Sequence, residues 1–323
     1  MTDSATQAEP VSRTHRAAIR RFDAWTRSFV GLCLTLILTL PPILTGSSSH
    51  AAAPPESIPS PGLERLFRIS PRVYSGSSPS TEADFAQIRS LGVTTIVSVD
   101  GARPDVERAR GHGLRYAHLP IGYDGIPMER QAQLVKSVSD ESAVIYVHCH
   151  HGQHRGPAAA AVLCLATDGW SKDDALSWLE RAGTSTNYPG LFRSLAEFRS
   201  VDAATLAKVP PLPEIAPTTA LVDSMVAADS HLEHLKAASK AGWKNIPGHP
   251  DLEPRHEATL LWELLRELGR QPAAHQKLMV ESGQTTEALR TTLERTPVHV
   301  EEATVALQAV EKTCAACHKA HRN

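Results

Sequence analysis

Aromatic side chains are scarce in this sequence, and neither sign of charge predominates. Phe, Trp and Tyr make up 5% of the 323 residues, and 33 basic residues stand against 35 acidic ones, giving a formal net charge of −2. Proteins that bind nucleic acid need a basic excess to neutralise phosphates, so no nucleic-acid partner is expected. A chain of 323 residues is long enough for two domains.

Cysteine is too sparse for a disulfide scaffold. The sequence holds five cysteines, and they are unevenly placed, at Cys33, Cys149, Cys164, Cys314 and Cys317. Domains stapled by disulfides carry more cysteines in a shorter chain. Each cysteine therefore needs its own explanation. Cys164 lies in an Ala-rich stretch with helical character, and we expect it to pack in a core.

The first residues have the features of an export signal. An arginine-rich stretch precedes an apolar run at 29–40, which two prolines end and small residues at 49–51 follow. The run is shorter than the roughly 20 residues that a membrane-spanning helix needs. We expect residues 1–51 to direct export to the periplasm and to be removed together with Cys33. If this segment stays uncleaved, it is the part of the chain that would contact a membrane.

Proline-rich stretches divide the rest of the chain. Proline cannot continue a helix or a central strand, so clusters of it mark linkers. The sequence predicts an unstructured linker at 52–62, a first domain at 63–204, a Pro-rich linker at 205–217 and a second domain at 218–323.

Short apolar runs alternate with amphipathic stretches in the first domain. The expected strands are 67–69, 73–75, 94–98, 114–118 and 143–148, and the expected helices are 81–91, 104–112 and 127–138. This alternation predicts an α/β fold with a central, mostly parallel sheet and flanking helices. Ligands of such sheets bind beyond the carboxyl ends of the strands.

The most apolar of these strands runs directly into Cys149, and an Ala-rich helix begins at Gly156. The loop between them can direct backbone N–H groups at an anion in front of the helix N-terminus. Arg155 offers a planar fork for phosphate, and Gly152 lets the backbone turn. The helix dipole and Arg155 favour the thiolate form of Cys149, so the pattern indicates a nucleophile beside an anion site.

The sequence His148-Cys149-x-x-Gly152-x-x-Arg155 resembles the signature HCxxGxxR of cysteine-dependent tyrosine and dual-specificity protein phosphatases. The resemblance covers most of residues 62–202. It implies a phosphorylated substrate, with Cys149 attacking phosphorus and Arg155 holding the phosphate oxygens.

The same resemblance implies an aspartate on an upstream loop that protonates the leaving oxygen. Asp124 is the candidate for this general acid, and Glu129 is the second choice. The residues expected to surround the substrate are His148, His150, His151, Gly152, Gln153 and His154.

One position departs from the phosphatase pattern and leaves alternatives open. The family has Ser or Thr directly after the arginine, and this chain has Gly156, which implies slow turnover of the phosphoenzyme or a domain that binds without turnover. The loop histidines could hold Zn²⁺ or Cu²⁺, or they could add positive potential around the anion. Sulfur transfer by a persulfide on Cys149 is a further alternative, although it would leave Asp124 without a role.

The second domain shows four amphipathic stretches, at 218–241, 253–270, 272–295 and 298–320, the third of them with an expected break near Gly283. Helical stripes joined by short connections predict an antiparallel four-helix bundle.

The last of these stretches carries Cys314-Ala-Ala-Cys317-His318. This is the attachment pattern of a covalent c-type haem, with His318 as an axial ligand of the iron. A redox pair of thiols and half of a zinc site are the alternatives. A bundle that ends in this motif resembles cytochrome c′ and its relatives, and the resemblance implies one haem c and a redox partner protein.

Residues on the first helix of the bundle could face the other side of the haem. Met225 lies on the inward stripe of that helix, as a distal ligand or as a packing residue that leaves five-coordinate iron. His231 and His234 are further candidates for the sixth ligand.

The sequence therefore predicts an exported protein in which a phosphate-monoester phosphatase is fused to a monohaem cytochrome for electron transfer or for redox or gas sensing. The alternative is an electron-transfer cytochrome whose first domain binds an anion or a partner without catalysis.

Overall fold

The computed structural model describes residues 54–244 and 252–321. The expected export signal at 1–51, with Cys33, lies outside the described residues. Within the described ranges, no helix has both the length and the hydropathy that a membrane span requires.

The first domain is built on one mixed sheet. Its strands are β1 (Glu56–Ser57), β2 (Phe67–Arg68), β3 (Val73–Gly76), β4 (Thr95–Ser98), β5 (Arg115–His118) and β6 (Ile145–His148). The order across the sheet is β1-β2-β3-β6-β4-β5. β3, β6, β4 and β5 run parallel, whereas β1 and β2 add an antiparallel edge. The expected mostly parallel sheet is confirmed for these four strands.

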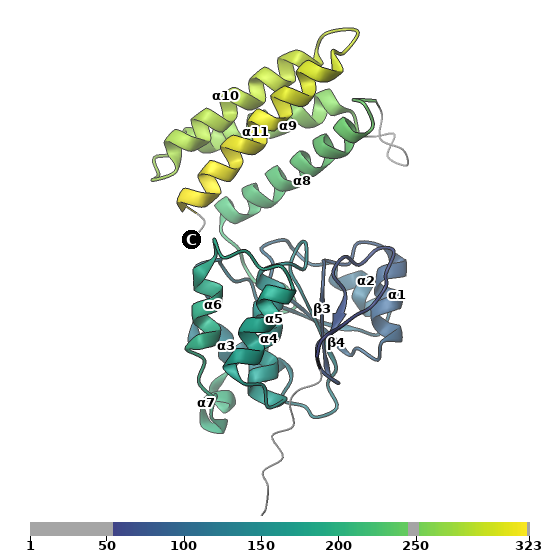
Figure 1. The fold of residues 1–323 in the computed structure, drawn as a ribbon, viewed down its shortest axis with the longest axis vertical. Coiled ribbons are helices and arrows are strands. Elements are labelled where there is room, and N and C mark those ends of the chain that lie inside the picture. The colour runs from purple at the N-terminus through teal and green to yellow at the C-terminus, as the bar shows by residue number, and fades with distance from the viewer. Residues whose placement is uncertain (1–53, 245–251, 322–323) are drawn as a thin grey trace, which may run out of the picture. The chain divides into compact units, whose positions relative to one another are not determined.

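Helices cover both faces of the sheet (Figure 1). One face packs against α1 (Glu82–Ser90) and α2 (Val106–Gly111). The other packs against α3 (Met128–Ser137), α4 (Arg155–Thr167), α5 (Lys172–Arg181) and α6 (Pro189–Ala196). Leu163 and Cys164 of α4 are fully buried in this core, so the expectation that Cys164 packs in the core is confirmed.

Two segments expected to be linker are structured. β1 lies inside the expected unstructured linker at 52–62, because Glu56 and Ser57 pair with β2 and extend the sheet edge. A short helix, α7 (Ala203–Lys208), crosses the expected boundary at 204, and Asp202 caps it by accepting a hydrogen bond of 2.6 Å from the amide of Thr205. The proline-rich composition therefore indicates where the linkers lie, but a short strand or helix can still form at their ends.

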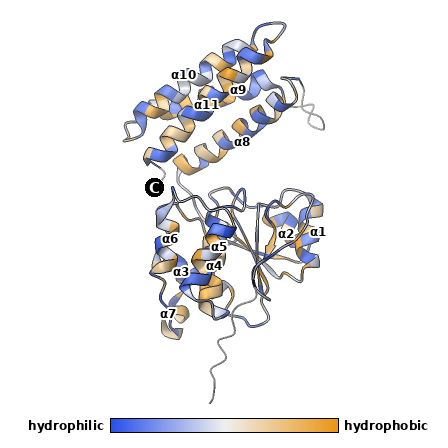
Figure 2. Cartoon of the chain, viewed as in Figure 1, coloured by the Kyte–Doolittle hydropathy of each residue, from blue (hydrophilic) through white to orange (hydrophobic). Residues whose placement is uncertain are grey.

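The second domain contains α8 (Ala220–Lys240), α9 (Pro254–Gly269), α10 (Gln276–Leu293) and α11 (Val300–His321). α8 packs on α9, α9 on α10, α10 on α11 and α11 on α8, which is a four-helix bundle. Figure 2 shows hydrophilic and hydrophobic residues interspersed along these helices, and the apolar ones form a common core that includes Leu235, Leu261, Leu289 and Leu307.

The expected break near Gly283 is wrong, because α10 runs through this residue. Gly283 is buried, and a Cβ placed on it would lie 3.8 Å from the backbone nitrogen of Arg266 in α9. That distance is an ordinary van der Waals contact, so a side chain at this position would fit against α9, and nothing in the structure explains why it is glycine.

Candidate active site

The loop that carries Cys149 joins the end of β6 to the start of α4. In the parallel register, His148 of β6 is aligned with Gly76 of β3 and with Ser98 of β4. The residues that follow these three strands therefore meet at one edge of the sheet, in front of the α4 N-terminus. This is the edge at which parallel α/β sheets bind ligands.

Gly152 makes the tight path of this loop possible. Its φ is +65°, and a Cβ on it would lie 2.4 Å from the carbonyl carbon of Gly76. Any other residue would be both strained and in collision with the backbone of the neighbouring segment. The expectation that the loop needs glycine at this position is confirmed.

Cys149 begins the loop as a free, buried thiol. A pocket lies next to Cys149. The part of its wall that the first domain supplies includes most of the loop from Cys149 to Arg155. The residues of this wall are Asp100, Gly101, Ala102, Pro120, Ile121, Gly122, Tyr123, Arg130, Cys149, His150, His151, Gln153, His154, Arg155 and Tyr188.

Arg155 is held by a buried aspartate that the sequence did not indicate. Its Nη2 lies 3.1 Å from Asp100 Oδ1, and the two side chains are 10% and 8% exposed. Burial alone would lower the pKa of Arg155, but Asp100, Tyr123 and Cys149 together outweigh it and raise that pKa. Burial alone would raise the pKa of Asp100, and the charge of Arg155 holds it below its usual range.

The guanidinium of Arg155 keeps a free donor for an anion. Its Nε is buried and has no hydrogen-bond partner among the described residues. The ring of Tyr123 packs against the guanidinium, with its centroid 4.7 Å from the Arg155 Cζ, and the ring of Tyr188 lies 4.4 Å from that of Tyr123. Tyr123, supported by Tyr188, and Asp100 therefore orient the guanidinium, whose N–H groups could donate to a phosphate.

His148 does not line the pocket, which corrects its placement among the substrate-surrounding residues. It is 2% exposed, and its Nε2 lies 2.7 Å from the hydroxyl oxygen of Tyr116. Burial lowers its pKa to about 4, so the ring is neutral near neutral pH. His148 is the last residue of β6, and its contact with Tyr116 holds the start of the loop in place.

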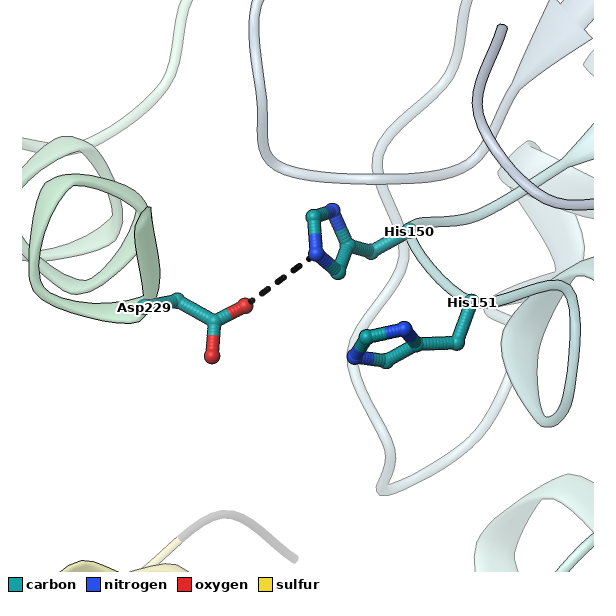
Figure 3. A group of neighbouring side chains, drawn as sticks. All are labelled: His150, His151 and Asp229. Carbon is teal, nitrogen blue, oxygen red and sulfur yellow. Dashed lines mark ion pairs between the residues drawn. The ribbon is translucent and has the colours of Figure 1, made fainter. Parts of the chain in front are cut away.

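The other loop histidines, His150, His151 and His154, line the pocket. His150 and His151 have ring centroids 4.3 Å apart, and His150 Nε2 lies 3.7 Å from the Asp229 carboxylate of α8 (Figure 3). The ligand atoms of these three residues are close enough to hold a metal ion. The ring of His154 packs on Tyr188, with centroids 4.9 Å apart.

Asp124 lies on the loop that follows β5, next to Tyr123. Its side chain is exposed, its Oδ1 turns toward Gly122, and its carbonyl oxygen accepts a hydrogen bond of 3.1 Å from Arg193. The pocket wall includes its neighbours Gly122 and Tyr123 but not Asp124 itself. Glu129, the second choice, is exposed in the first turn of α3.

A second pocket lies inside the bundle and brings together the residues of the C-terminal motif. Cys314, Cys317 and His318 of α11 line it, as do Met225 of α8 and Met279 of α10. The remaining lining residues are Ala228, Asp229, Leu232, Leu261, Leu265 and Ser282. The cavity has a volume of about 50 Å³ and opens to solvent. Burial raises the pKa of the Cys314 thiol to about 11.

Three of these features escaped the sequence reasoning. Asp100 follows a strand end directly, a position typical of site residues in parallel sheets, and this was the available signal. Tyr123 precedes Asp124 and gave no signal of its own. Met279 lies on α10, and the sequence pattern pointed only to the first helix of the bundle for a residue opposite His318.

A cysteine and an arginine lie at the two ends of a glycine-turned loop, between a parallel strand and a helix, which is the arrangement that the resemblance to cysteine-dependent phosphatases implied. No protein-family model matches the chain. Over 171 residues it is 28% identical to the dual-specificity protein phosphatase TpbA of Pseudomonas aeruginosa, an alignment that spans 50% of this chain and 73% of that protein. TpbA of a second strain of the species is 24% identical over 164 residues, with the same coverage.

These relatives support a TpbA-like dual-specificity phosphatase domain over about half of the chain. The crystal structure of Pseudomonas aeruginosa TpbA superposes with a TM-score of 0.39 and 22% identity, over 48% of this chain and 96% of that one.

Proposed function

We propose that the first domain hydrolyses phosphate monoesters of proteins through a phosphoenzyme on Cys149. The observation that carries this proposal is the Arg155 guanidinium, which is buried, paired with Asp100 and left with an unsatisfied Nε beside the Cys149 pocket. A buried charged donor without a partner is costly, and a phosphate oxygen is the acceptor that suits it. The similarity to dual-specificity phosphatases supports the same reaction.

The proposed reaction has two steps. The Cys149 thiolate attacks phosphorus, the bond from phosphorus to the leaving oxygen breaks, and Asp124 gives that oxygen its proton. Water then attacks the thiophosphate, the sulfur–phosphorus bond breaks, and inorganic phosphate and the thiolate are released. Arg155 and the loop N–H groups would bind the phosphoryl oxygens in both steps. Asp124 serves as the acid only after its exposed carboxyl turns into the pocket.

Hydrolysis of p-nitrophenyl phosphate by the purified full chain tests this proposal. We expect Cys149→Ser to abolish release of p-nitrophenol, because serine is far less nucleophilic than a thiolate at neutral pH. Cys164→Ser is the matched control, since Cys164 is a buried core thiol remote from the pocket wall. Equal activity in Cys149→Ser and wild type would refute the proposal.

One observation favours the second candidate, an anion- or partner-binding domain without turnover. A Cβ at position 156 would lie 3.5 Å from Cys149 Sγ, so the hydroxyl of a serine or threonine there would be close to the sulfur. Gly156 supplies no such hydroxyl. In that case the domain would bind inorganic phosphate or a phosphopeptide with the same Arg155, and no more than one equivalent of p-nitrophenol per chain would be released from p-nitrophenyl phosphate.

We further propose that the bundle carries one covalent haem c. The pocket between α8, α9, α10 and α11 supports this, because both motif cysteines and His318 line it and its other walls are mostly apolar. Cys314 and Cys317 would hold the group by thioether bonds, and His318 would be an axial ligand. The bound haem would supply one-electron chemistry or bind a diatomic gas, with a redox protein as partner.

Covalent attachment of haem occurs outside the cytoplasm, so this proposal includes export to the periplasm. A pyridine haemochrome spectrum of protein expressed with and without its first 51 residues tests both points. We expect one haem per chain in the full-length protein and none in Cys314→Ser/Cys317→Ser. Haem-free protein from periplasmic fractions of cells that mature other c-type cytochromes would contradict it.

A further inference from the structure

Two histidines of α8 converge on a buried glutamate of α9, apart from the Cys149 loop. His231 Nδ1 lies 2.9 Å and His234 Nδ1 2.7 Å from the same oxygen, Glu257 Oε2. The two histidines lie on one face of α8, three residues apart, and they present the same ring nitrogen to the carboxylate. None of the three residues lines the pocket of the C-terminal motif.

The burial of these side chains is uneven. Glu257 is 4% exposed, although a carboxylate is among the groups least often buried without a partner. The His231 and His234 side chains are 22% and 38% exposed, so the cluster opens to solvent on the α8 side. The two histidine contacts hold the pKa of Glu257 below its usual value, against the effect of burial. The carboxylate is therefore charged, and it needs cationic or N–H partners on that side.

We propose that His231, His234 and Glu257 form a site for a divalent cation of the zinc class, with a water molecule at the fourth position. The three ligand atoms lie within 4.8 Å of one another. In a tetrahedral zinc site, ligand atoms that lie about 2.0–2.2 Å from the metal are about 3.3–3.6 Å apart. The two contacts would have to lengthen by roughly 0.5–1 Å to admit the ion, and the side-chain torsions of these half-buried histidines can supply that change.

Two histidines and one carboxylate with an open fourth position is a ligand set of hydrolytic zinc centres. Because the three ligands come from α8 and α9, the ion would cross-link these helices. Leu232 lies between the two histidines on α8, and Leu261 lies one turn beyond Glu257 on α9. Both leucines line the bundle pocket, so a bound ion would fix two walls of that pocket.

Zinc binding to the full chain tests the proposal. Chelator-treated protein is dialysed against Zn²⁺, and bound metal is counted by mass spectrometry. We expect His231→Asn/His234→Asn to bind one equivalent less per chain than wild type, and Glu257→Gln to bind the same ion about 10- to 100-fold more weakly. The control His256→Asn, which changes an exposed neighbour of Glu257 outside the cluster, should bind as wild type does.

Differences between variants are measured because other residues, such as His150 and His151, could also take zinc. A second measurement on wild type avoids variants that fail to fold. Modification of histidines by diethyl pyrocarbonate is mapped with and without one equivalent of Zn²⁺, and we expect protection of His231 and His234 but not of His256. Equal zinc counts in all variants, or unchanged modification of both histidines, would overturn the proposal.

Discussion

Asp100 and Arg155 form a buried ion pair, with Oδ1 and Nη2 3.1 Å apart, although 55 residues separate them in the sequence. The pair exists because the ends of β4 and β6 are aligned at the same edge of the sheet. Asp100 also accepts a hydrogen bond of 2.6 Å from the amide of Gly101, which fixes the carboxylate. Asp100 is thus a positioning residue that orients the guanidinium proposed to bind phosphate.

Asp100→Asn tests this role. The change keeps the shape of the side chain but leaves the buried Arg155 charge unpaired, at a cost of about 3 kcal/mol in the free energy of unfolding. Loss of orientation should also lower kcat/KM for p-nitrophenyl phosphate by about 100-fold. Asp173→Asn, in the exposed first turn of α5, is the control and should change neither quantity. A folded Asp100→Asn protein with wild-type kcat/KM would show that Asp100 only stabilises the domain.

We predict that Gly156 slows the breakdown of the proposed phosphoenzyme. A Cβ at this position would lie 3.1 Å from the Cys149 amide nitrogen and 3.5 Å from its Sγ, so a serine hydroxyl could reach the sulfur with a small adjustment. We expect Gly156→Ser to raise the steady-state rate while the burst rate changes little, because a hydroxyl stabilises the departing thiolate. Stopped-flow release of p-nitrophenol separates the two rates.

Gly156→Ala is the matched control for that experiment, since it adds the Cβ without the hydroxyl. If alanine accelerates the steady state as serine does, the effect comes from loop packing and not from the hydroxyl. If neither variant shows a burst, the slow step precedes the phosphoenzyme.

Asp124→Asn addresses the proposed general acid. Asp124 is exposed and Glu129 is exposed on α3, so the two changes are matched in burial. We expect Asp124→Asn to lower kcat/KM for phenyl phosphate by about 100-fold, because kcat/KM reports the first step and its leaving group needs a proton. The loss should be smaller for p-nitrophenyl phosphate, whose leaving group is stable as an anion. Glu129→Gln should leave both rates unchanged, and the opposite pattern would assign the acid to Glu129.

Buried His148 makes the stability of the first domain depend on pH. Burial lowers its pKa to about 4, below the value of about 6.5 for the unfolded chain. As the pH falls, the unfolded chain therefore takes up the proton first. The stability that neutral His148 contributes is present above about pH 6.5 and is lost as the pH falls toward about 4, by on the order of 3 kcal/mol.

Urea unfolding of wild type and His148→Gln at several pH values isolates this contribution. Glutamine cannot titrate, so the variant should lose less free energy of unfolding than wild type between about pH 6.5 and about pH 4. The difference between the two slopes removes the effect of other titrating groups. Parallel pH curves for the two proteins would mean that His148 keeps an ordinary pKa.

Local patterns in the sequence predicted the parts of the fold that depend on neighbours in the chain. The strand before Cys149, the glycine turn at Gly152 and the four amphipathic helices each follow from composition and spacing. The order of the strands in the sheet does not follow from local patterns. Without that order, the ion pair of Asp100 with Arg155 could not be predicted. Gly283 and His148 were misjudged for a related reason, because tertiary packing decides whether a glycine breaks a helix and whether a histidine faces solvent.

Two methionines of the bundle pocket are candidates for the distal ligand of the proposed haem. Met225 and Met279 both line the pocket with His318, from α8 and from α10. If Met225 is the distal ligand of the proposed haem, Met225→Ala should convert the absorption spectrum from low spin to high spin, because a thioether ligand is lost. Met279→Ala should then keep the low-spin spectrum, since it removes a packing contact only. The reverse result would assign the ligand to Met279, and a high-spin spectrum in wild type would mean that both methionines only pack against the porphyrin.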